Sequence, residues 1–211
     1  MKITKFAHCS LLIEHNGTRL LTDPGNYTDA QNSLTNLDAI LITHEHADHL
    51  HIPNLEALRT INPDTPIICN AAVAPLLDEA KLTYTLVADG ETITINGVTI
   101  QGIEEPHAEI HRSLPRVPNT GFMVGEYLFY PGDAYIVPKD PVTVLALPMG
   151  GPWVKIGEAL DYALQIKPQH VFPVHDGGLK STALNTRLGS SILEDASITF
   201  HDLPDGASID L

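Results

Sequence analysis

Apolar residues along the chain form short runs and alternating segments, separated by turns rich in glycine, proline and asparagine. This pattern is typical of a protein that contains both strands and helices. Strands or hairpins are predicted at residues 2–13, 18–22, 37–43, 65–69, 91–101, 121–130, 142–147 and 170–174. Helices are predicted at residues 54–61, 72–81, 156–166 and 184–193, and a short terminal pair of strands follows them.

The order of these elements indicates the fold class. In each half of the chain hairpins come first, at Asn16-Gly17 and at Asn96-Gly97, pairs that favour the positive φ of tight turns. Strands that alternate with helices follow, and the continuous apolar runs are those of strands buried on both faces. Two such halves predict an α/β protein, a four-layer αββα sandwich of two packed sheets with helices outside. No linker separates the halves, so residues 1–211 are expected to form one domain.

Charge and cysteine content restrict the partners and the compartment. The chain has 26 acidic and 12 basic residues, a formal charge of −14, which repels nucleic-acid phosphates and anionic membranes. We therefore expect neither as a partner. Two cysteines and an N-terminus without a signal-peptide pattern favour the cytoplasm, and no apolar run is long enough to span a membrane. The protein is expected to fold alone or as a homo-oligomer.

Histidine is the unusual component, with eleven residues, several of them beside aspartate. His44, His46, Asp48 and His49 lie within six residues, directly after the predicted strand 37–43. Imidazoles two positions apart at a strand end can face the same way and bind one metal, with a third ligand from elsewhere. Asp48 and His49 can then turn towards a second metal at the roughly 3.5–4 Å spacing of two-metal hydrolases. A polar loop that is merely rich in histidine is the less favoured interpretation.

The sequence His-Glu-His-Ala-Asp-His at residues 44–49 resembles the HxHxDH signature of the metallo-β-lactamase superfamily, whose fold is the αββα sandwich. The resemblance covers nearly the whole chain and implies a ligand set. One metal would be held by His44, His46 and His107, the other by Asp48, His49 and His175, with Asp133 bridging them. His8 and Ser10 resemble the opening of the branch that contains ascorbate 6-phosphate lactonase and the phospholipase D-type N-acyl-phosphatidylethanolamine hydrolases.

Several of these positions have alternatives. His111 competes with His107 as the ligand after the mid-chain hairpin, and His107 is favoured because it adjoins a strand end. Asp23 matches a position that would orient a ligand histidine, although it also suits a turn before proline. Asp133 also suits a turn, and Asp176 could share the role of His175. Four further residues could line a pocket, but a solvated surface is favoured for each: Arg112, Arg116, Trp153 and Lys155.

The resemblance implies a metal-dependent hydrolase, in which hydroxide between two divalent ions, zinc before manganese or iron, attacks the substrate. Asp48 would orient that water, and His111 or water on the second metal would protonate the leaving group. The expected substrate is a small, anionic ester, lactone or phosphoester. Two alternatives share the fold: an iron-dependent sulfur dioxygenase and a non-catalytic metal-binding module.

Overall fold

The computed structural model describes residues 1–211 and contains two seven-stranded sheets. The first sheet has, in spatial order, β14 (Ser208–Asp210), β1 (Lys2–Ala7), β2 (Ser10–His15), β3 (Thr18–Thr22), β4 (Ala39–Leu41), β5 (Ile67–Cys69) and β6 (Tyr84–Leu86). The second has β13 (Thr199–Phe200), β12 (His170–Val174), β11 (Val144–Pro148), β10 (Leu128–Tyr130), β9 (Pro118–Val124), β8 (Val98–Pro106) and β7 (Thr92–Ile95).

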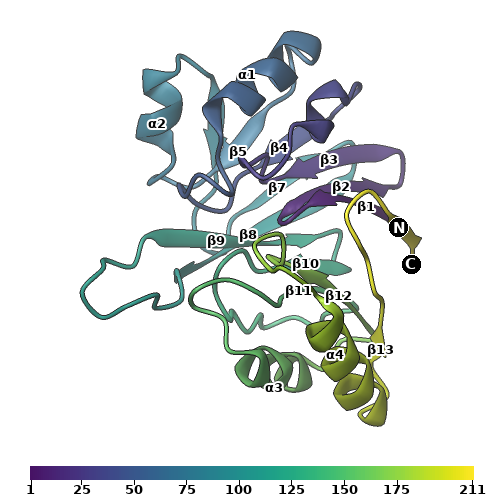
Figure 1. The fold of residues 1–211 in the computed structure, drawn as a ribbon. Helices are drawn as coiled ribbons and strands as arrows, with labels where there is room; N and C mark the ends of the chain where they lie inside the picture. Colours follow the sequence, from purple (N-terminus) through teal and green to yellow (C-terminus); the bar gives the residue numbers. More distant parts are fainter.

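Helices cover the outer face of each sheet, which gives four layers (Figure 1). The helix pair α1 (Ile52–Ile61) and α2 (Ala74–Glu79) lies on the first sheet, with the short 3₁₀ helix η1 (Ala30–Ser33) beside α1. The pair α3 (Ile156–Ile166) and α4 (Ala183–Asp195) lies on the second. None of these helices has the length and apolar character needed to cross a membrane. The expected αββα sandwich is confirmed.

The two sheets share one topology. In the order of strands across each sheet, three antiparallel pairings are followed by three parallel ones: β3 to β6 run parallel in the first sheet and β10 to β13 in the second. The parallel strands of a half therefore end at the same edge of their sheet. The predicted order of hairpins first and alternating strands and helices afterwards is confirmed in both halves.

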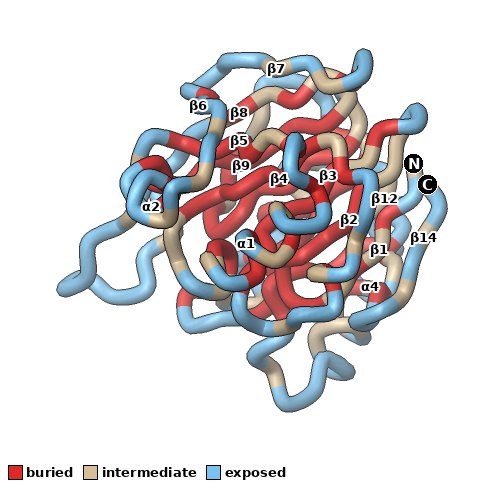
Figure 2. The backbone as a smooth tube through the Cα atoms, turned by 90° about the horizontal axis from the view of Figure 1, so that it is seen from above, coloured by how far each residue is buried: buried red, intermediate tan, exposed pale blue.

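Alternation along the central strands explains the layers. In β4, Ala39 and Leu41 pack in the core between the sheets, whereas Ile40 packs under α1 and α2. In β11, Val144 packs between the sheets and Leu145 packs under α3 and α4. Successive side chains of a strand point to opposite faces, so a strand covered on both sides must be apolar throughout. The buried backbone accordingly runs through the centre of the molecule (Figure 2).

Two of the predicted strand assignments are wrong. Residues 2–13 do not form one strand, because the chain turns at His8 and Cys9, where His8 adopts a φ of 55°. The two terminal strands do not pair with each other: β13 pairs with β12, and β14 pairs with β1 in the opposite sheet. Neighbouring strands often pair, but here each terminal strand covers a different open sheet edge.

Candidate metal centre

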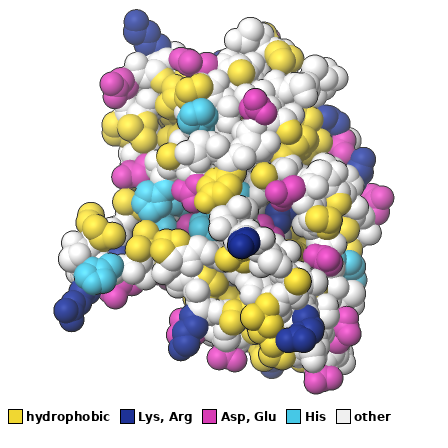
Figure 3. Space-filling view, in the orientation of Figure 1, with side chains coloured by type: hydrophobic (Ala, Val, Ile, Leu, Met, Phe, Trp, Pro, Cys, Tyr) yellow, Lys and Arg dark blue, Asp and Glu magenta, His cyan; other side chains and the backbone are white.

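Four strand ends deliver polar side chains to one edge of the sandwich. His44, His46, Asp48 and His49 follow β4, and His107 directly follows β8. Two further groups come from the second half of the chain, Asp133 after β10 and His175 after β12. In the space-filling view histidine and acidic side chains gather between the two halves of the molecule (Figure 3). The structure thus brings together all seven predicted ligand positions.

The first group contains three imidazoles, those of His44, His46 and His107. Their nitrogen atoms lie within 4.8 Å of one another, and His44 Nε2 is 3.1 Å from His46 Nδ1. His107 Nδ1 donates to the carbonyl of Ala108 at 2.6 Å, which leaves Nε2 free to face the group. Three nitrogen donors at this spacing form one face of a tetrahedral site.

The second group contains Asp48, His49 and His175. The Oδ2 atom of Asp48 lies 3.7 Å from His49 Nε2 and 3.5 Å from His175 Nε2. The opposite nitrogen of each imidazole is occupied, because His175 Nδ1 donates to the carbonyl of Gly150 at 2.8 Å and His49 Nδ1 donates to Asp23 at 2.8 Å. Such outer partners fix the ring orientation of metal-binding histidines.

Asp133 lies between the two groups and contacts both. Its Oδ1 is 3.1 Å from His49 Nε2, and its Oδ2 is 3.2 Å from His107 Nε2 and 2.7 Å from His175 Nε2. Trp153 Nε1 donates to the same Oδ2 at 3.0 Å. The Asp133 side chain is almost completely buried, so its position is set by these contacts.

The turn that carries Asp133 is held by Asn119 of β9. The Asn119 amide donates to the carbonyl of Pro131 at 2.9 Å and accepts from the backbone N–H of Asp133 at 3.0 Å. Gly132 has a φ of +63°, and a Cβ atom there would lie 2.3 Å from Asn119 Oδ1. Glycine is required because the backbone conformation and the close amide both exclude a side chain.

The buried charges of the cluster stabilise one another. Burial alone would raise the pKa of Asp133, but the imidazoles of His49 and His175 hold it well below its usual range. Burial alone would lower the pKa of His175, but Asp133 raises it to about 9. Asp133 and Asp23 also raise the pKa of His49 well above 6.5, whereas burial and the nearby His49 lower that of His44. The carboxylate is therefore ionised, and positive charge concentrates beside it.

Three inner atoms of the cluster are buried without a hydrogen bond of acceptable geometry: His49 Nε2, His175 Nε2 and Asp133 Oδ1. A buried polar group without a partner costs about 1–3 kcal/mol, so such atoms need an explanation. Imidazole nitrogens and a carboxylate oxygen are donors that zinc and related divalent ions prefer. The residues present therefore fit a bound divalent metal.

Asp23 holds the floor of the cluster. Its carboxylate accepts from the Thr43 backbone N–H at 2.8 Å, from the Thr43 hydroxyl at 2.7 Å, from His49 Nδ1 at 2.8 Å and from the Tyr130 hydroxyl. The contact with His49 is the one that the sequence resemblance implies for this position. Thr43 and Tyr130 were not singled out from the sequence, because a threonine and a tyrosine at strand ends carry no distinctive signal.

Replacing Asp23 with asparagine should weaken both folding and metal binding. All the groups that contact this side chain are hydrogen-bond donors, so the amide N–H group of asparagine would have to face one of them. We expect this to destabilise the protein by about 1–3 kcal/mol. Metal affinity should fall by about 10–100-fold, since His49 loses its anionic partner. Thermal unfolding and metal titration would measure the two effects. Asp29→Asn, the same change at an exposed position, should alter neither, and equal behaviour of both variants would contradict this role.

Other predicted positions lie outside the cluster. His111 is exposed in the loop after His107, and its Nδ1 bonds the hydroxyl of Ser113. Arg112 and Lys155 are also exposed. The surface assignment of Trp153 is wrong, because its indole is buried against Asp133, where an N–H donor has a carboxylate to bind. Arg116 donates to the carbonyls of Pro106 and His107 and so fixes the end of β8.

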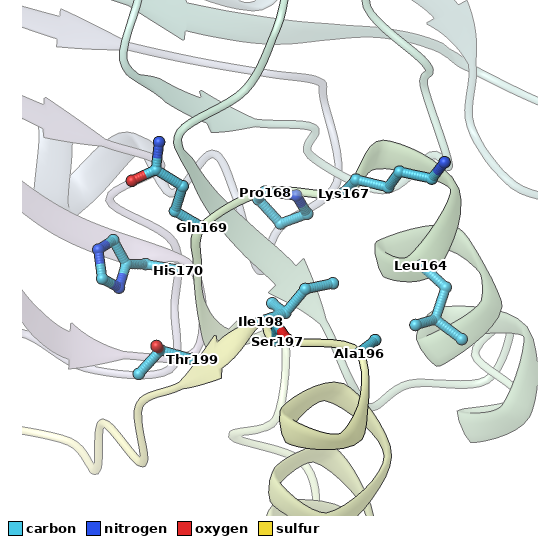
Figure 4. Close-up of a pocket in the computed structure, with 9 residues that line it drawn as sticks. All are labelled: Leu164, Lys167, Pro168, Gln169, His170, Ala196, Ser197, Ile198 and Thr199. Carbon is cyan, nitrogen blue, oxygen red and sulfur yellow. The ribbon is translucent and has the colours of Figure 1, made fainter.

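A hollow of about 660 Å³ lies away from the cluster, between the ends of α3 and α4 and the starts of β12 and β13 (Figure 4). Its lining includes Lys167, Gln169 and His170 but none of the clustered ligand candidates. Size alone therefore does not identify the functional site in this fold. The concentration of buried ionisable groups does.

The αββα sandwich and a histidine and aspartate cluster at its strand ends are the features of the metallo-β-lactamase class. A model of the beta-lactamase superfamily domain matches residues 2–175, and the chain belongs to this superfamily.

Relatives of known sequence or structure agree with this assignment. Protein Rv0786c of Mycobacterium tuberculosis is 34% identical over 99% of either chain. UPF0173 metal-dependent hydrolase MJ1163 of Methanocaldococcus jannaschii is 28% identical over 66% of this chain and 67% of its own. The solved structure of Igni18, a metallo hydrolase of Ignicoccus hospitalis, has a TM-score of 0.76 at 19% identity and covers 100% of this chain and 98% of its own. Together with the family match, these similarities agree with membership of the superfamily, and two of these relatives are described as metal-dependent or metallo hydrolases.

Proposed function

We propose that this protein is a binuclear hydrolase that cleaves an ester, lactone or phosphoester bond in a small anionic substrate. The observation that supports two metals is the position of Asp133, whose carboxylate contacts His107 of one group and His49 and His175 of the other. A single carboxylate between two sets of donors is the arrangement expected of a bridging ligand. Both halves of the chain supply ligands, so the proposal treats residues 1–211 as one catalytic domain.

The donor atoms divide into two sets. His44 Nε2, His46 Nδ1 and His107 Nε2 would hold the first ion, and Asp48, His49 Nε2 and His175 Nε2 the second. Most donors are imidazoles, which suits zinc, and manganese or iron would bind the same set. When bound, such ions lower the pKa of a coordinated water and polarise the oxygen of the bond under attack.

The residues of the chain supply orientation and exclusion of water. Asp48 is the least buried carboxylate of the cluster, with 27% of its side chain exposed, so it can accept a hydrogen bond from the attacking water at the mouth of the site. Trp153 Nε1–H holds Asp133 in place, and its ring covers His107 and His175 at centroid distances of 5.8 and 5.6 Å. Fixed dipoles in a buried site favour charge development in the transition state.

The charge distribution favours a small anion. The chain carries −14 overall, but two divalent ions would add about four positive charges against the carboxylates of Asp48 and Asp133. An anionic ester, lactone or phosphoester would be attracted to that point and repelled elsewhere, whereas an extended polyanion would meet repulsion over its whole length.

Metal content measured together with turnover tests this proposal. The purified protein should contain two divalent ions per chain and hydrolyse members of a panel of lactones, carboxylic esters and phosphodiesters. One iron per chain with oxygen uptake would favour the dioxygenase alternative, and metal without turnover of any panel member would favour a binding module.

Replacing Asp48 with alanine should lower kcat at least about 100-fold, because the attacking water loses the carboxylate that orients it. Glu45 is the matched control: it is an acidic residue of the same loop outside the clustered groups, and Glu45→Ala should stay near the wild-type kcat. Hydrolysis assays on the best panel substrate provide the measurement. Substantial activity in Asp48→Ala would remove Asp48 from the mechanism.

A further inference from the structure

His8 lies inside the cluster although no ligand assignment includes it. It occupies the two-residue turn between β1 and β2 and is 2% exposed. Its ring stacks on Tyr27 at a centroid distance of 4.1 Å and lies 4.1 Å from the ring of His175. The ligand-type atoms of His8, Cys9, His49 and His175 all fall within 4.8 Å of one another. By proximity alone, His8 would be an additional metal ligand.

The four fully buried histidines that we assign as ligands share one hydrogen-bond polarity. In each, the nitrogen that faces away from the cluster, here called the outer nitrogen, meets an acceptor. The acceptors are Asp23 for His49, the Gly150 carbonyl for His175, the Ala108 carbonyl for His107 and the Thr43 hydroxyl for His44. That hydroxyl gives its own hydrogen to Asp23, so its oxygen accepts from His44. Each outer nitrogen therefore carries a proton whatever the charge of the ring, so the inner nitrogen is the one that presents a lone pair to a metal once the ring is neutral.

His8 has the opposite polarity. Its outer nitrogen, Nδ1, faces the backbone N–H of Gly177 at 3.1 Å, and a backbone N–H can only donate. Nδ1 must therefore hold the lone pair and the proton must sit on Nε2. That inner Nε2–H points at Asp48 Oδ2, 3.2 Å away. An imidazole nitrogen that carries a proton cannot coordinate a metal.

Gly177 makes this arrangement possible. A Cβ atom at residue 177 would lie 2.9 Å from Tyr27 Cδ1 and 3.1 Å from His8 Cβ, closer than such contacts normally occur. Only glycine lets the backbone N–H approach Nδ1 while Tyr27 stacks on the His8 ring. The turn after β12 thus fixes both His175, as a candidate ligand, and the tautomer of His8.

We propose that His8 is a positioning residue that donates from Nε2 to Asp48 and holds its carboxylate against the second set of donors, and that it is not a metal ligand. This inference rests on the proposed function, because Asp48 is the group through which His8 acts. A carboxylate on a partly exposed loop can rotate, and rotation would move Oδ2 away from His49 and His175. A fixed N–H donor prevents that rotation.

Nitrogen NMR of the zinc-loaded protein with labelled histidines tests the tautomer without any activity assay. The His8 signals, assigned by their loss in His8→Gln, should show a protonated Nε2 and an Nδ1 that is hydrogen-bonded and free of metal. Protonation at Nδ1 with a metal-shifted Nε2 would identify His8 as a ligand and overturn the proposal. Because the spectrum does not depend on turnover, it remains decisive even if every panel substrate fails.

Two substitutions separate the two hydrogen bonds of His8. In His8→Asn the amide oxygen can occupy the place of Nδ1 and accept from Gly177, but nothing reaches Asp48. In His8→Gln the amide nitrogen can occupy the place of Nε2 and donate to Asp48. We expect His8→Asn to lose about 10–100-fold in kcat with little change in KM, and His8→Gln to recover at least about tenfold of that loss.

Metal content and thermal unfolding complete the comparison. Both variants should retain wild-type metal content at saturating zinc, and asparagine tolerates the positive φ of this turn. Loss of one metal in either variant would contradict the proposal. An equal decrease of kcat in the two variants would also contradict it. If His8 had only a structural role, His8→Gln, which keeps the donor to Asp48, would have no advantage over His8→Asn, which keeps the acceptor for Gly177.

Discussion

Asp133→Ala is expected to lose at least about 10³-fold in kcat/KM and to bind less than the full complement of metal. The reason is that the Asp133 carboxylate contacts both sets of donors and is buried among three imidazoles and an indole. Alanine removes the carboxylate that offsets the positive charge of these imidazoles and of any bound metal. A 10³-fold loss corresponds to about 4 kcal/mol of transition-state stabilisation, within the several kcal/mol that metal centres supply.

The control for this variant is Asp161→Ala, in which an exposed aspartate of α3 is truncated in the same way. We expect it to keep wild-type turnover and metal content. Metal analysis of both variants separates loss of an ion from loss of chemistry. Full metal content and turnover within tenfold of wild type in Asp133→Ala would exclude a bridging role.

The layers of the fold follow directly from apolar patterning, and the exceptions have local causes. Continuous apolar runs such as residues 142–147 identify strands buried on both faces, because no other short element needs apolar side chains on every side. The turn at His8 escaped prediction because positive φ is uncommon at any residue other than glycine and the flanking residues are apolar. The pairing of β14 escaped prediction because it joins β1 near the other end of the chain, a contact that no local pattern encodes.

The sequence predicts the candidate site where its residues are close together in the chain, and where they follow strands whose ends should meet at one edge of the sandwich. The cluster from His44 to His49 is visible as a motif, and the family resemblance adds His107, Asp133 and His175. Contacts made through backbone groups were not predictable, since they depend on how distant turns meet. The N–H of Gly177 that fixes His8 and the amide of Asn119 that fixes Asp133 are of this kind. Sequence therefore indicates the donors, whereas structure shows what orients them.

The same buried charges predict that metal binding displaces protons and depends steeply on pH. In protein stripped by a chelator, Asp133 raises the pKa of His175 to about 9 and, with Asp23, raises that of His49 well above 6.5. Both imidazoles should therefore be protonated near pH 7, and both must lose a proton to become ligands. We expect about two protons to be released per chain near pH 7, and affinity to rise with pH by up to about 100-fold per unit while both imidazoles are protonated and less steeply as the pH approaches 9.

The stability of the stripped protein should show the opposite dependence on pH. A histidine whose pKa is higher in the folded than in the unfolded state stabilises the fold fully below the unfolded value of about 6.5. That contribution is lost as the pH rises through the folded value of His175, about 9. The free energy of unfolding should therefore fall between pH 6.5 and 9 without metal and hold steady or rise with it. Calorimetric zinc titrations in buffers of different ionisation enthalpy count the protons, and denaturant unfolding measures stability. Zinc binding without proton release at pH 7 would mean that Asp133 does not hold these imidazoles in their charged form.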